Sequence, residues 1–227
     1  MRMTLILMLC LLAACGRPLT EGETAFADAL AGPAVDTASV RFHNGHFAGS
    51  FTYTRPVRPR LTCQERIFPP SDGETVTVSP GAMVLLNTVL FRRDLYRDDL
   101  MPGFPGLIDL ADAMLVAHEL AHVWQWQNRA ETGYHPLKAA REHRDSPDPY
   151  LFEPDTEGDF LTYGYEQQGA IVEEYVCCRL LDPQAPRTAR LRDMISRHMP
   201  VDRLEQALDR PLVRLPWSGA EPRGICR

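Results

Sequence analysis

The sequence has no excess of basic residues. Its 24 lysines and arginines are outnumbered by 30 aspartates and glutamates, so the formal net charge is −6. Proteins that bind nucleic acids usually carry a basic face that contacts the phosphates, and this charge balance therefore argues against a nucleic-acid partner. The 227-residue chain also contains no internal repeat and no low-complexity segment, which argues against a repeat architecture.

Long apolar runs are absent after the N-terminus, so no transmembrane helix is expected in the rest of the chain. The N-terminal run TLILMLCLLAA follows a short basic start and is too short to span a bilayer as a mature helix. It ends in Leu12-Ala13-Ala14-Cys15, which resembles the lipobox of bacterial lipoproteins, where the cysteine becomes the lipidated first residue. We therefore expect a signal peptide at residues 1–14 and lipid on Cys15. An ordinary secretory peptide cut near Ala14 is the alternative.

The residue after Cys15 bears on the destination of the protein. An aspartate at this position tends to retain Gram-negative lipoproteins at the inner membrane, but this chain has Gly16. The sequence therefore predicts a protein of the cell envelope. We expect the lipid on Cys15 to anchor it to the periplasmic face of the outer membrane.

Few cysteines remain for disulfides, which an exported protein can form. After Cys15 the chain contains Cys63, Cys177, Cys178 and Cys226. Adjacent helical residues point about 100° apart, so Cys177 and Cys178 are not expected to bond to each other. Cys226 lies in a tail rich in proline and glycine, and we expect it to bond to Cys63 or Cys178. The sequence leaves both partners open.

The residue pattern changes from strand-like to helical along the chain. Thr20 and Glu23 have the spacing of a capping box before a short helix that ends at Gly32. Strand-like runs follow at 38–42, 49–54 and 74–91, with turns expected at Asn44-Gly45, at 79–81 and at Asn87. Helical periodicity is found at 107–133, 165–182, 190–199 and 202–210. Two segments rich in proline and charge are expected to be loops, at 55–73 and 134–162.

The longest helical pattern contains the motif H-E-x-x-H at residues 118–122. Helical residues four apart lie on nearly the same face, so His118 and His122 can direct their imidazoles at one point. Zinc binds neutral imidazole, and two such ligands leave room for a third ligand and a water. Glu119 lies about 100° round the helix, where a carboxylate can take a proton from that water. The motif therefore predicts zinc ligands at His118 and His122 and a general base at Glu119; a buried histidine pair without metal is the alternative.

A catalytic zinc site needs a third protein ligand, and the next predicted helix carries three glutamates. Glu166 follows His122 by 44 residues and stands at the start of this helix. Glu173 shares its helix face and could accept a hydrogen bond from a ligand histidine. Glu174 points further round and is expected to be solvated.

Four segments resemble a bacterial group, the Vgr-related metallopeptidases: PGAMVLLNTVLF, LYRDDL, HELAHVWQWQ and YGYEQQGAIVEEY, within about residues 79–176. That group has a similar H-E-x-x-H-V-W-Q-x-Q run and a later Y-G-x-E-Q-Q-x-x-I-V run. The resemblance implies His118, His122 and Glu166 as ligands and Glu119 as base. It favours Glu166 over Glu173 as the third ligand. Thermolysin-like enzymes have an aspartate four residues after the ligand glutamate to orient a ligand histidine, whereas this chain has Ala170, and Glu173 could substitute.

Peptide hydrolysis also needs a hydrogen-bond donor for the developing oxyanion. Tyr163 and Tyr165, at the start of the second helix, are the candidates, and Tyr134 and His135 follow the first helix.

The order of the elements predicts an α+β, zincin-like fold, with a small β-sheet followed by the H-E-x-x-H helix and a second helix that supplies Glu166. We expect the lipidated N-terminus, a tether and a short helix at 15–36, and a single metallopeptidase domain at 37–227. The expected activity is zinc-dependent hydrolysis of peptide or protein substrates in the bacterial cell envelope. A non-catalytic, zinc-stabilised scaffold or binding lipoprotein is the alternative, and a structural lipoprotein without metal is a third interpretation.

Overall fold

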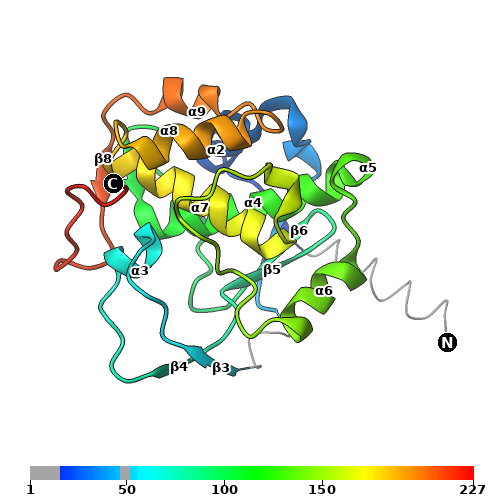
Figure 1. Ribbon diagram of the computed structural model, residues 1–227. Helices are drawn as coiled ribbons and strands as arrows, with labels where there is room; N and C mark the ends of the chain where they lie inside the picture. The colour runs from blue at the N-terminus through cyan, green and yellow to red at the C-terminus, as the bar shows by residue number, and fades with distance from the viewer. Residues whose placement is uncertain (1–15, 47–51) are drawn as a thin grey trace.

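The computed structural model describes residues 16–46 and 52–227. The predicted signal peptide and the lipidation site Cys15 lie outside these residues. The described chain is α+β, as the sequence predicts, with small β-sheets and a body made mainly of helices (Figure 1). Within the described residues, no helix is long and apolar enough to cross a membrane.

The largest sheet has four strands in the order β1 (Arg17–Pro18), β2 (Arg41–Asn44), β6 (Thr88–Phe91) and β5 (Ala82–Leu85). β2 runs parallel to β6, and the other neighbouring pairs are antiparallel. All four residues of β6 are buried, which suits its β-branched and aromatic side chains. The expected turn at Asn87 joins β5 to β6, and β5 lies at one edge of the sheet.

Strands β3 (Tyr53–Pro56) and β4 (Thr75–Val78) form a separate antiparallel ribbon. The turn expected at Asn44-Gly45 would join its two flanking strand-like runs in a hairpin, but this pairing is wrong, because β2 pairs with β6 and β3 pairs with β4. Phe42 of β2 packs edge-to-face on Phe91 of β6, with ring centroids 4.9 Å apart. Burial of this aromatic pair favours the non-local, parallel pairing over a local hairpin.

Helices α4 (Leu110–Gln127) and α7 (Tyr165–Leu181) pack against each other through the centre of the body (Figure 1). Asp109 caps α4 and accepts a hydrogen bond from the backbone N–H of Asp112. The sequence predicts residues 107–109 as helical, but they form strand β7 (Leu107–Asp109), which ends at the cap residue and pairs with β8 (Leu212–Arg214). α7 ends before Pro183, as predicted.

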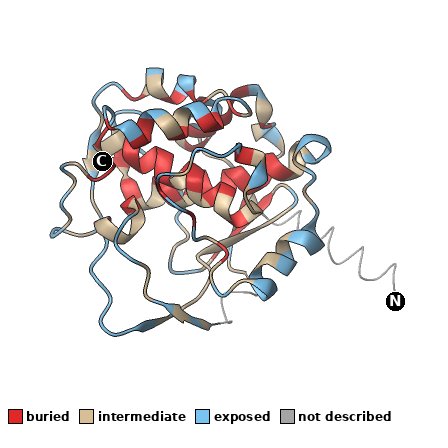
Figure 2. Ribbon diagram, viewed as in Figure 1, coloured by how far each residue is buried: buried red, intermediate tan, exposed pale blue. Residues whose placement is uncertain are grey.

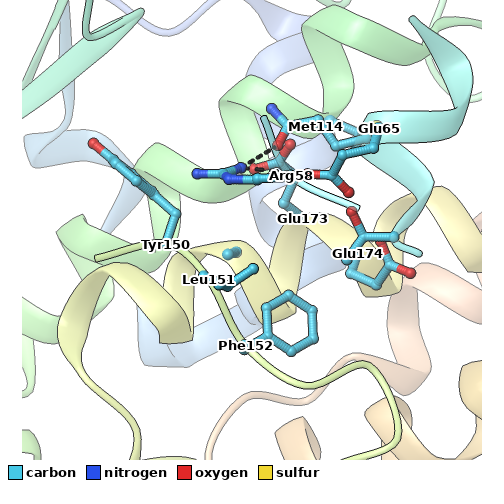
Figure 3. A pocket seen from close by; sticks show the side chains of 11 residues that line it. Arg58, Glu65, Met114, Tyr150, Leu151, Phe152, Glu173 and Glu174 are labelled. Atoms are coloured by element: carbon cyan, nitrogen blue, oxygen red, sulfur yellow. Dashed lines mark hydrogen bonds and ion pairs between the residues drawn. The ribbon is translucent and has the colours of Figure 1, made fainter. Parts of the chain in front are cut away.

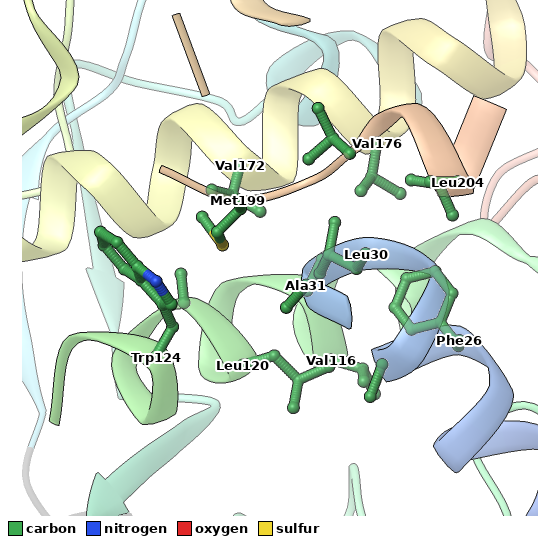
Figure 4. Close-up of a cluster of buried hydrophobic side chains, with 14 of the residues drawn as sticks. Phe26, Leu30, Ala31, Val116, Leu120, Trp124, Val172, Val176, Met199 and Leu204 are labelled. Carbon is green, nitrogen blue, oxygen red and sulfur yellow. The ribbon is translucent and has the colours of Figure 1, made fainter. Parts of the chain in front are cut away.

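The remaining helices surround this central pair: α2 (Glu21–Ala31), α5 (Arg129–Thr132), α8 (Pro186–Ile195) and α9 (Asp202–Ala207). Short 3-10 turns lie at Gly32–Ala34, Thr37–Ser39 and Phe160–Thr162. The predicted capping box of Thr20 and Glu23 is present at the start of α2. Apolar side chains of α2, α4 and α7 meet in one core, where Phe26, Leu120 and Val172 are fully or almost fully buried (Figure 4).

Two helices lie in segments that the sequence predicts as loops. α3 (Cys63–Ile67) is short, but both of its end residues are fully buried. α6 (Pro136–Asp145) has no buried residue and stands at the surface (Figure 2). α3 is too short and α6 too polar to show a hydrophobic pattern in the sequence. Contacts with distant residues hold both helices in place.

The described cysteines form two disulfides, Cys63–Cys177 and Cys178–Cys226. The expected disulfide of Cys226 is therefore present, and Cys178 is its partner. The adjacent Cys177 and Cys178 bond in different directions, as helix geometry predicts.

Candidate metal centre

Helices α4 and α7 bring three potential ligands to one point. His118 and His122 lie one turn apart on α4, and their Nε2 atoms are 3.2 Å from each other. Oε2 of Glu166, from the first turn of α7, lies 3.3 Å and 3.2 Å from these two nitrogens. All three residues are buried, and ligand atoms of the group lie within 4.8 Å of one another. This group could hold a metal ion.

The outer nitrogen of each imidazole contacts a carboxylate or amide oxygen. Nδ1 of His118 lies 3.1 Å from Oε2 of Glu173, and Nδ1 of His122 lies 2.9 Å from Oε1 of Gln125. Because both partners accept hydrogen bonds, each Nδ1 atom donates its proton to its partner. The Nε2 atoms face the common point, where neutral imidazoles could offer their lone pairs to a metal ion. The structure thus places Glu173 beside His118, one of the two candidate ligands.

Gln125 was given no role by the sequence, yet it is fully buried. Its amide nitrogen donates to the backbone carbonyl of Tyr165 and to Oε1 of Gln168, both on α7. With its own oxygen directed at His122, Gln125 joins the two helices at the level of the site. Its position one turn after His122 was the sequence signal that could have identified it.

The second oxygen of Glu166 is also held. Nε2 of His143, on α6, lies 2.8 Å from Oε1 of Glu166. The preceding residue, Glu142, accepts hydrogen bonds from the backbone N–H groups of Tyr165 and Glu166, at 3.0 Å and 3.2 Å. Glu142 therefore caps the start of α7 from another helix, and α6 fixes both the backbone and the side chain of Glu166.

The charges of these groups are tightly coupled. Burial disfavours the Glu166 carboxylate, but the charge of His122 and hydrogen bonds to the surrounding histidines hold its pKa well below the usual range. Burial likewise lowers the pKa of His118, and hydrogen bonds to Glu166 and Glu173 more than offset it and raise that pKa well above its usual value. Without metal, His118 therefore favours its protonated form between the carboxylates of Glu166 and Glu173. A divalent cation would compensate the negative charge of the same carboxylates.

Glu119 differs from the potential ligands because one of its oxygens is free. The residue is only 4% exposed, and its Oε2 is buried with no hydrogen-bond partner among the described residues. Burial raises the pKa of Glu119, while the charges of His118 and His122 oppose the rise. A buried acceptor without a protein partner is costly, so this oxygen is suited to a water or a substrate group.

An open cleft of about 1260 Å³ leads to the site. Its walls come from α4, the edge strand β5, the β3–β4 ribbon and α6, and His118, Glu119 and Glu166 line it. The volume exceeds that of usual small-molecule pockets, so the cleft can admit a segment of a larger molecule.

Tyr150 forms part of the cleft wall beside the histidines. Its ring centroid lies 5.7 Å from that of His118 and 5.8 Å from that of His143. The Arg58 guanidinium lies over the same ring and binds both carboxylate oxygens of Asp148 at 2.6 Å. Figure 3 shows Arg58 between Tyr150 and Glu65, beside a small separate cavity of about 20 Å³.

The two tyrosines expected to face the reaction centre do not do so. The hydroxyl of Tyr163 contacts Thr156 and accepts a hydrogen bond from the backbone N–H of Gly158. The hydroxyl of Tyr165 donates to the backbone carbonyl of Gly133. Both hydroxyls therefore contact loop segments, and neither tyrosine lines the cleft that contains His118 and Glu166.

The expectation that Glu174 is solvated is wrong. The residue is 2% exposed, pairs with Arg187 at 2.9 Å and accepts a hydrogen bond from the backbone N–H of Cys63 at 2.7 Å. α3 and α8 cover this face of α7, and neither contact is visible from the local helix pattern.

Gly169 allows the two central helices to approach at the site. A Cβ atom at this position would lie 2.8 Å from the Nε2 and Cε1 atoms of His118. Any side chain here would therefore displace the imidazole.

No protein-family model matches the chain, and no curated protein matches it. Among solved structures, it is similar to the effector domain of Pseudomonas aeruginosa VgrG2b, with a TM-score of 0.49 and 22% sequence identity. The alignment covers 81% of this chain and 84% of that one. Similarity at this level assigns neither an activity nor a substrate to this chain.

Proposed function

We propose that this protein is a zincin-like, zinc-dependent peptidase, in which His118, His122 and Glu166 bind the metal and Glu119 is the general base. The observation that carries this proposal is the convergence of three buried ligand atoms within 4.8 Å at the wall of a large cleft. Two imidazoles and one carboxylate are the donor set of several catalytic zinc sites. The free Oε2 of Glu119 supplies the acceptor that a structural zinc site does not require.

The residues of the chain divide the chemistry among them. When bound, zinc would acidify a water molecule and polarise the carbonyl of the substrate. The free Oε2 of Glu119 would accept a proton from the attacking water and deliver it to the leaving amine. Glu173 and Gln125 keep the proton on Nδ1 of the two histidines, and His143 fixes the rotation of the Glu166 carboxylate.

Tyr150 replaces Tyr163 and Tyr165 as the candidate donor to the oxyanion. It lines the cleft and packs on His118. Burial, followed by the nearby charge of Glu166, raises its pKa well above the usual value, so the phenol keeps its proton at neutral pH.

We also propose that the enzyme acts in the cell envelope, on peptide or protein substrates, from a lipid anchor on Cys15. The two disulfides support an oxidising compartment, because disulfides are rare in proteins of the reducing cytoplasm.

The proposed function is tested by separating metal binding from hydrolysis. We expect His118→Ala to lose zinc in metal analysis, because it removes one of three ligands. Glu119→Gln should keep zinc but lose about 10²–10⁴-fold in cleavage of a general peptide library, because an amide cannot accept the proton. Glu157→Gln, which changes an exposed loop carboxylate, is the matched control and should leave both measurements unchanged.

Two results would contradict the proposal. If Glu119→Gln cleaves peptides as fast as the wild type, the assigned base is wrong. If the wild type binds zinc stoichiometrically but cleaves no member of the library, the metal joins α4 to α7 as part of a non-catalytic scaffold.

A further inference from the structure

The β3–β4 ribbon turns one of its faces toward the cleft. Register pairs Tyr53 with Val78 and Arg55 with Val76, so these four side chains share one face. They are partly buried, whereas the side chains that alternate with them are exposed. All four line the cleft, and none belongs to the hydrophobic core of the described residues. The ribbon is thus a wall of the cleft. Its two strands stand apart from the helical body of the molecule (Figures 1 and 2).

Arg55 is unusual among the arginines of this cleft because it is largely buried and yet has no carboxylate of its own. Arg58 binds both oxygens of Asp148 at 2.6 Å, Arg92 pairs with Asp94 at 2.6 Å, and Arg144 pairs with Asp145 at 2.8 Å. A fourth, Arg60, is exposed to water and donates to backbone carbonyls.

The Arg55 side chain, in contrast, is only 15% exposed. Its Nε is 3.9 Å from Asp148, whose two oxygens Arg58 already occupies. Its Nη1 donates to the backbone carbonyl of Pro56. Asp148 is its one carboxylate within 4.0 Å among the described residues, and the segments 1–15 and 47–51 contain no aspartate or glutamate.

In the described part of the chain, no carboxylate lies close enough to Arg55 to balance its positive charge fully. Burial and the positive charge of Arg58 lower the pKa of Arg55. Arg58 is also penalised by burial, yet its hydrogen bonds and its attraction to Asp148 raise its pKa. A partly desolvated guanidinium with unused donors on a cleft wall is suited to a carboxylate from outside the protein, which it can bind through two parallel hydrogen bonds.

The position of Arg55 places it near the metal centre but not on it. Asp148, its neighbour, precedes Tyr150 by two residues, and the Tyr150 ring lies 5.7 Å from His118. Tyr53, which shares the inner face of β3 with Arg55, is close enough to Glu166 that this carboxylate contributes to raising its pKa, after burial and Asp148. Arg55 and the candidate metal centre line the same cleft, so an extended substrate that reaches Glu119 can also pass along the wall that carries Arg55.

We infer that Arg55 binds a substrate carboxylate, so that the cleft selects peptides with an acidic side chain or a free C-terminal carboxylate near the scissile bond. This inference rests on the proposed function, because it names the substrate class of the same site. Both kinds of peptide offer a carboxylate to Arg55. They differ in whether this group belongs to a side chain or to the C-terminus of the peptide.

The test compares peptides that differ in one carboxylate. One series carries Asp or Asn, and Glu or Gln, at each position near the cleaved bond, and a second series ends in a free acid or an amide. We expect the wild type to prefer the acid over the amide by about 10–100-fold in kcat/KM, mainly through KM, since hydrogen bonds between charged groups are worth that much. The series that shows the preference identifies the source of the carboxylate.

Variants at Arg55 then assign the preference to this side chain. Arg55→Gln should abolish it, Arg55→Lys should keep part of it, and Arg55→Glu should favour peptides with Lys or Arg at the same position. Arg144→Gln removes a cleft arginine that has its own carboxylate, and it should keep the preference of the wild type. Equal kcat/KM for acid and amide peptides in the wild type, or a preference that survives in Arg55→Gln, would overturn the inference while leaving the peptidase proposal intact.

Binding separates this inference from a failure of the proposed function. If the wild type cleaves no peptide, the same series is titrated against zinc-loaded Glu119→Gln protein by fluorescence anisotropy. Tighter binding of the acid peptides that disappears in the Glu119→Gln/Arg55→Gln protein supports carboxylate recognition without catalysis. Equal binding of acids and amides overturns it.

Discussion

At the scale of single residues, each side chain of the candidate metal centre has one polar atom that contacts a neighbouring protein group and one that faces the common point. Each of the two histidines uses Nδ1 for a protein acceptor, so that Nε2 is the atom that a metal ion would contact. Glu166 is held through Oε1 by His143, which leaves Oε2 between the imidazoles. Glu119 keeps Oε2 free. The residues around the site therefore hold the candidate ligands in place without metal, which would reduce the entropy lost if a metal ion binds.

Gly169 gives a prediction at this scale. We expect Gly169→Ala to weaken zinc binding at least about 10-fold, because the new Cβ would lie 2.8 Å from the His118 ring and would turn its Nε2 away from the common point. Alanine also favours a helix over glycine by about 1 kcal/mol, so the metal-free protein should not lose helix content. Zinc affinity is measured by competition with a chelator, and helix content by circular dichroism.

Gly106→Ala is the control for this substitution. A Cβ at Gly106 would meet its nearest neighbour at 3.8 Å, an ordinary contact, so zinc affinity should be unchanged. Wild-type affinity in Gly169→Ala would show that the central helices tolerate a wider separation than the structure indicates.

The sequence predicted the part of the site that one helix determines. His118, Glu119 and His122 share one helical repeat, and the structure places the two imidazoles together as the repeat requires. The choice of Glu166 came from a family resemblance, and the structure brings that side chain to the histidines. Neither helical spacing nor the resemblance identifies His143 as part of the site. It contacts Glu166 because α6 packs beside the start of α7, and no hydrophobic pattern in the sequence predicts α6.

At the scale of elements, α7 places three glutamates in three environments. Glu166 and Glu173 are seven residues apart and face α4, as helical periodicity predicts. Glu174 faces α3 and α8, where it accepts from Cys63 and pairs with Arg187. The periodicity of α7 could predict which face Glu174 occupies, but not what covers that face.

The environment of Glu174 predicts a specific pH dependence of stability. Burial raises the pKa of Glu174 to about 7, despite the backbone donor of Cys63 and the charge of Arg187. Between about pH 4.5 and pH 7 the folded protein therefore binds more protons than the unfolded chain. Its free energy of unfolding should fall as pH rises through this window, by up to roughly 3 kcal/mol, and this contribution should be constant above it.

Unfolding by denaturant at several pH values measures this contribution. In Glu174→Gln, the difference from the wild type should change across the window, because the amide does not titrate. Glu157→Gln should give a curve parallel to that of the wild type. A Glu174→Gln curve that is also parallel would show that Glu174 titrates at its ordinary value.

The same distinction between local and distant causes explains the secondary structure. The long periodic helices α4 and α7 were predicted closely, because their hydrophobic pattern suffices to define them. α3 is five residues long and is fixed by the disulfide of Cys63, and α6 is polar and is fixed by contacts of Glu142 and His143. The parallel pairing of β2 with β6 likewise joins residues far apart in the chain.

At the scale of the whole molecule, two disulfides leave α7 from adjacent residues and serve different regions. Cys63–Cys177 joins α7 to α3, which lies between β3 and β4 in the chain and so anchors the ribbon of the cleft. Cys178–Cys226 joins α7 to the C-terminal tail. The first closes 114 residues of chain and the second 48, so each should stabilise the fold by about 4–5 kcal/mol through the entropy of the unfolded chain.

Removing each disulfide separately should therefore give similar losses of stability but different local effects. We expect Cys63→Ala/Cys177→Ala and Cys178→Ala/Cys226→Ala both to unfold at lower denaturant concentration. Only the first should speed amide hydrogen exchange in residues 53–56 and 75–78, because the ribbon has few other attachments to the body. Arg58 still binds Asp148 in that variant, so the ribbon should loosen rather than detach, and zinc content should be retained. Equal exchange of the ribbon in the two variants would show that the Arg58–Asp148 pair alone holds this wall of the cleft in place.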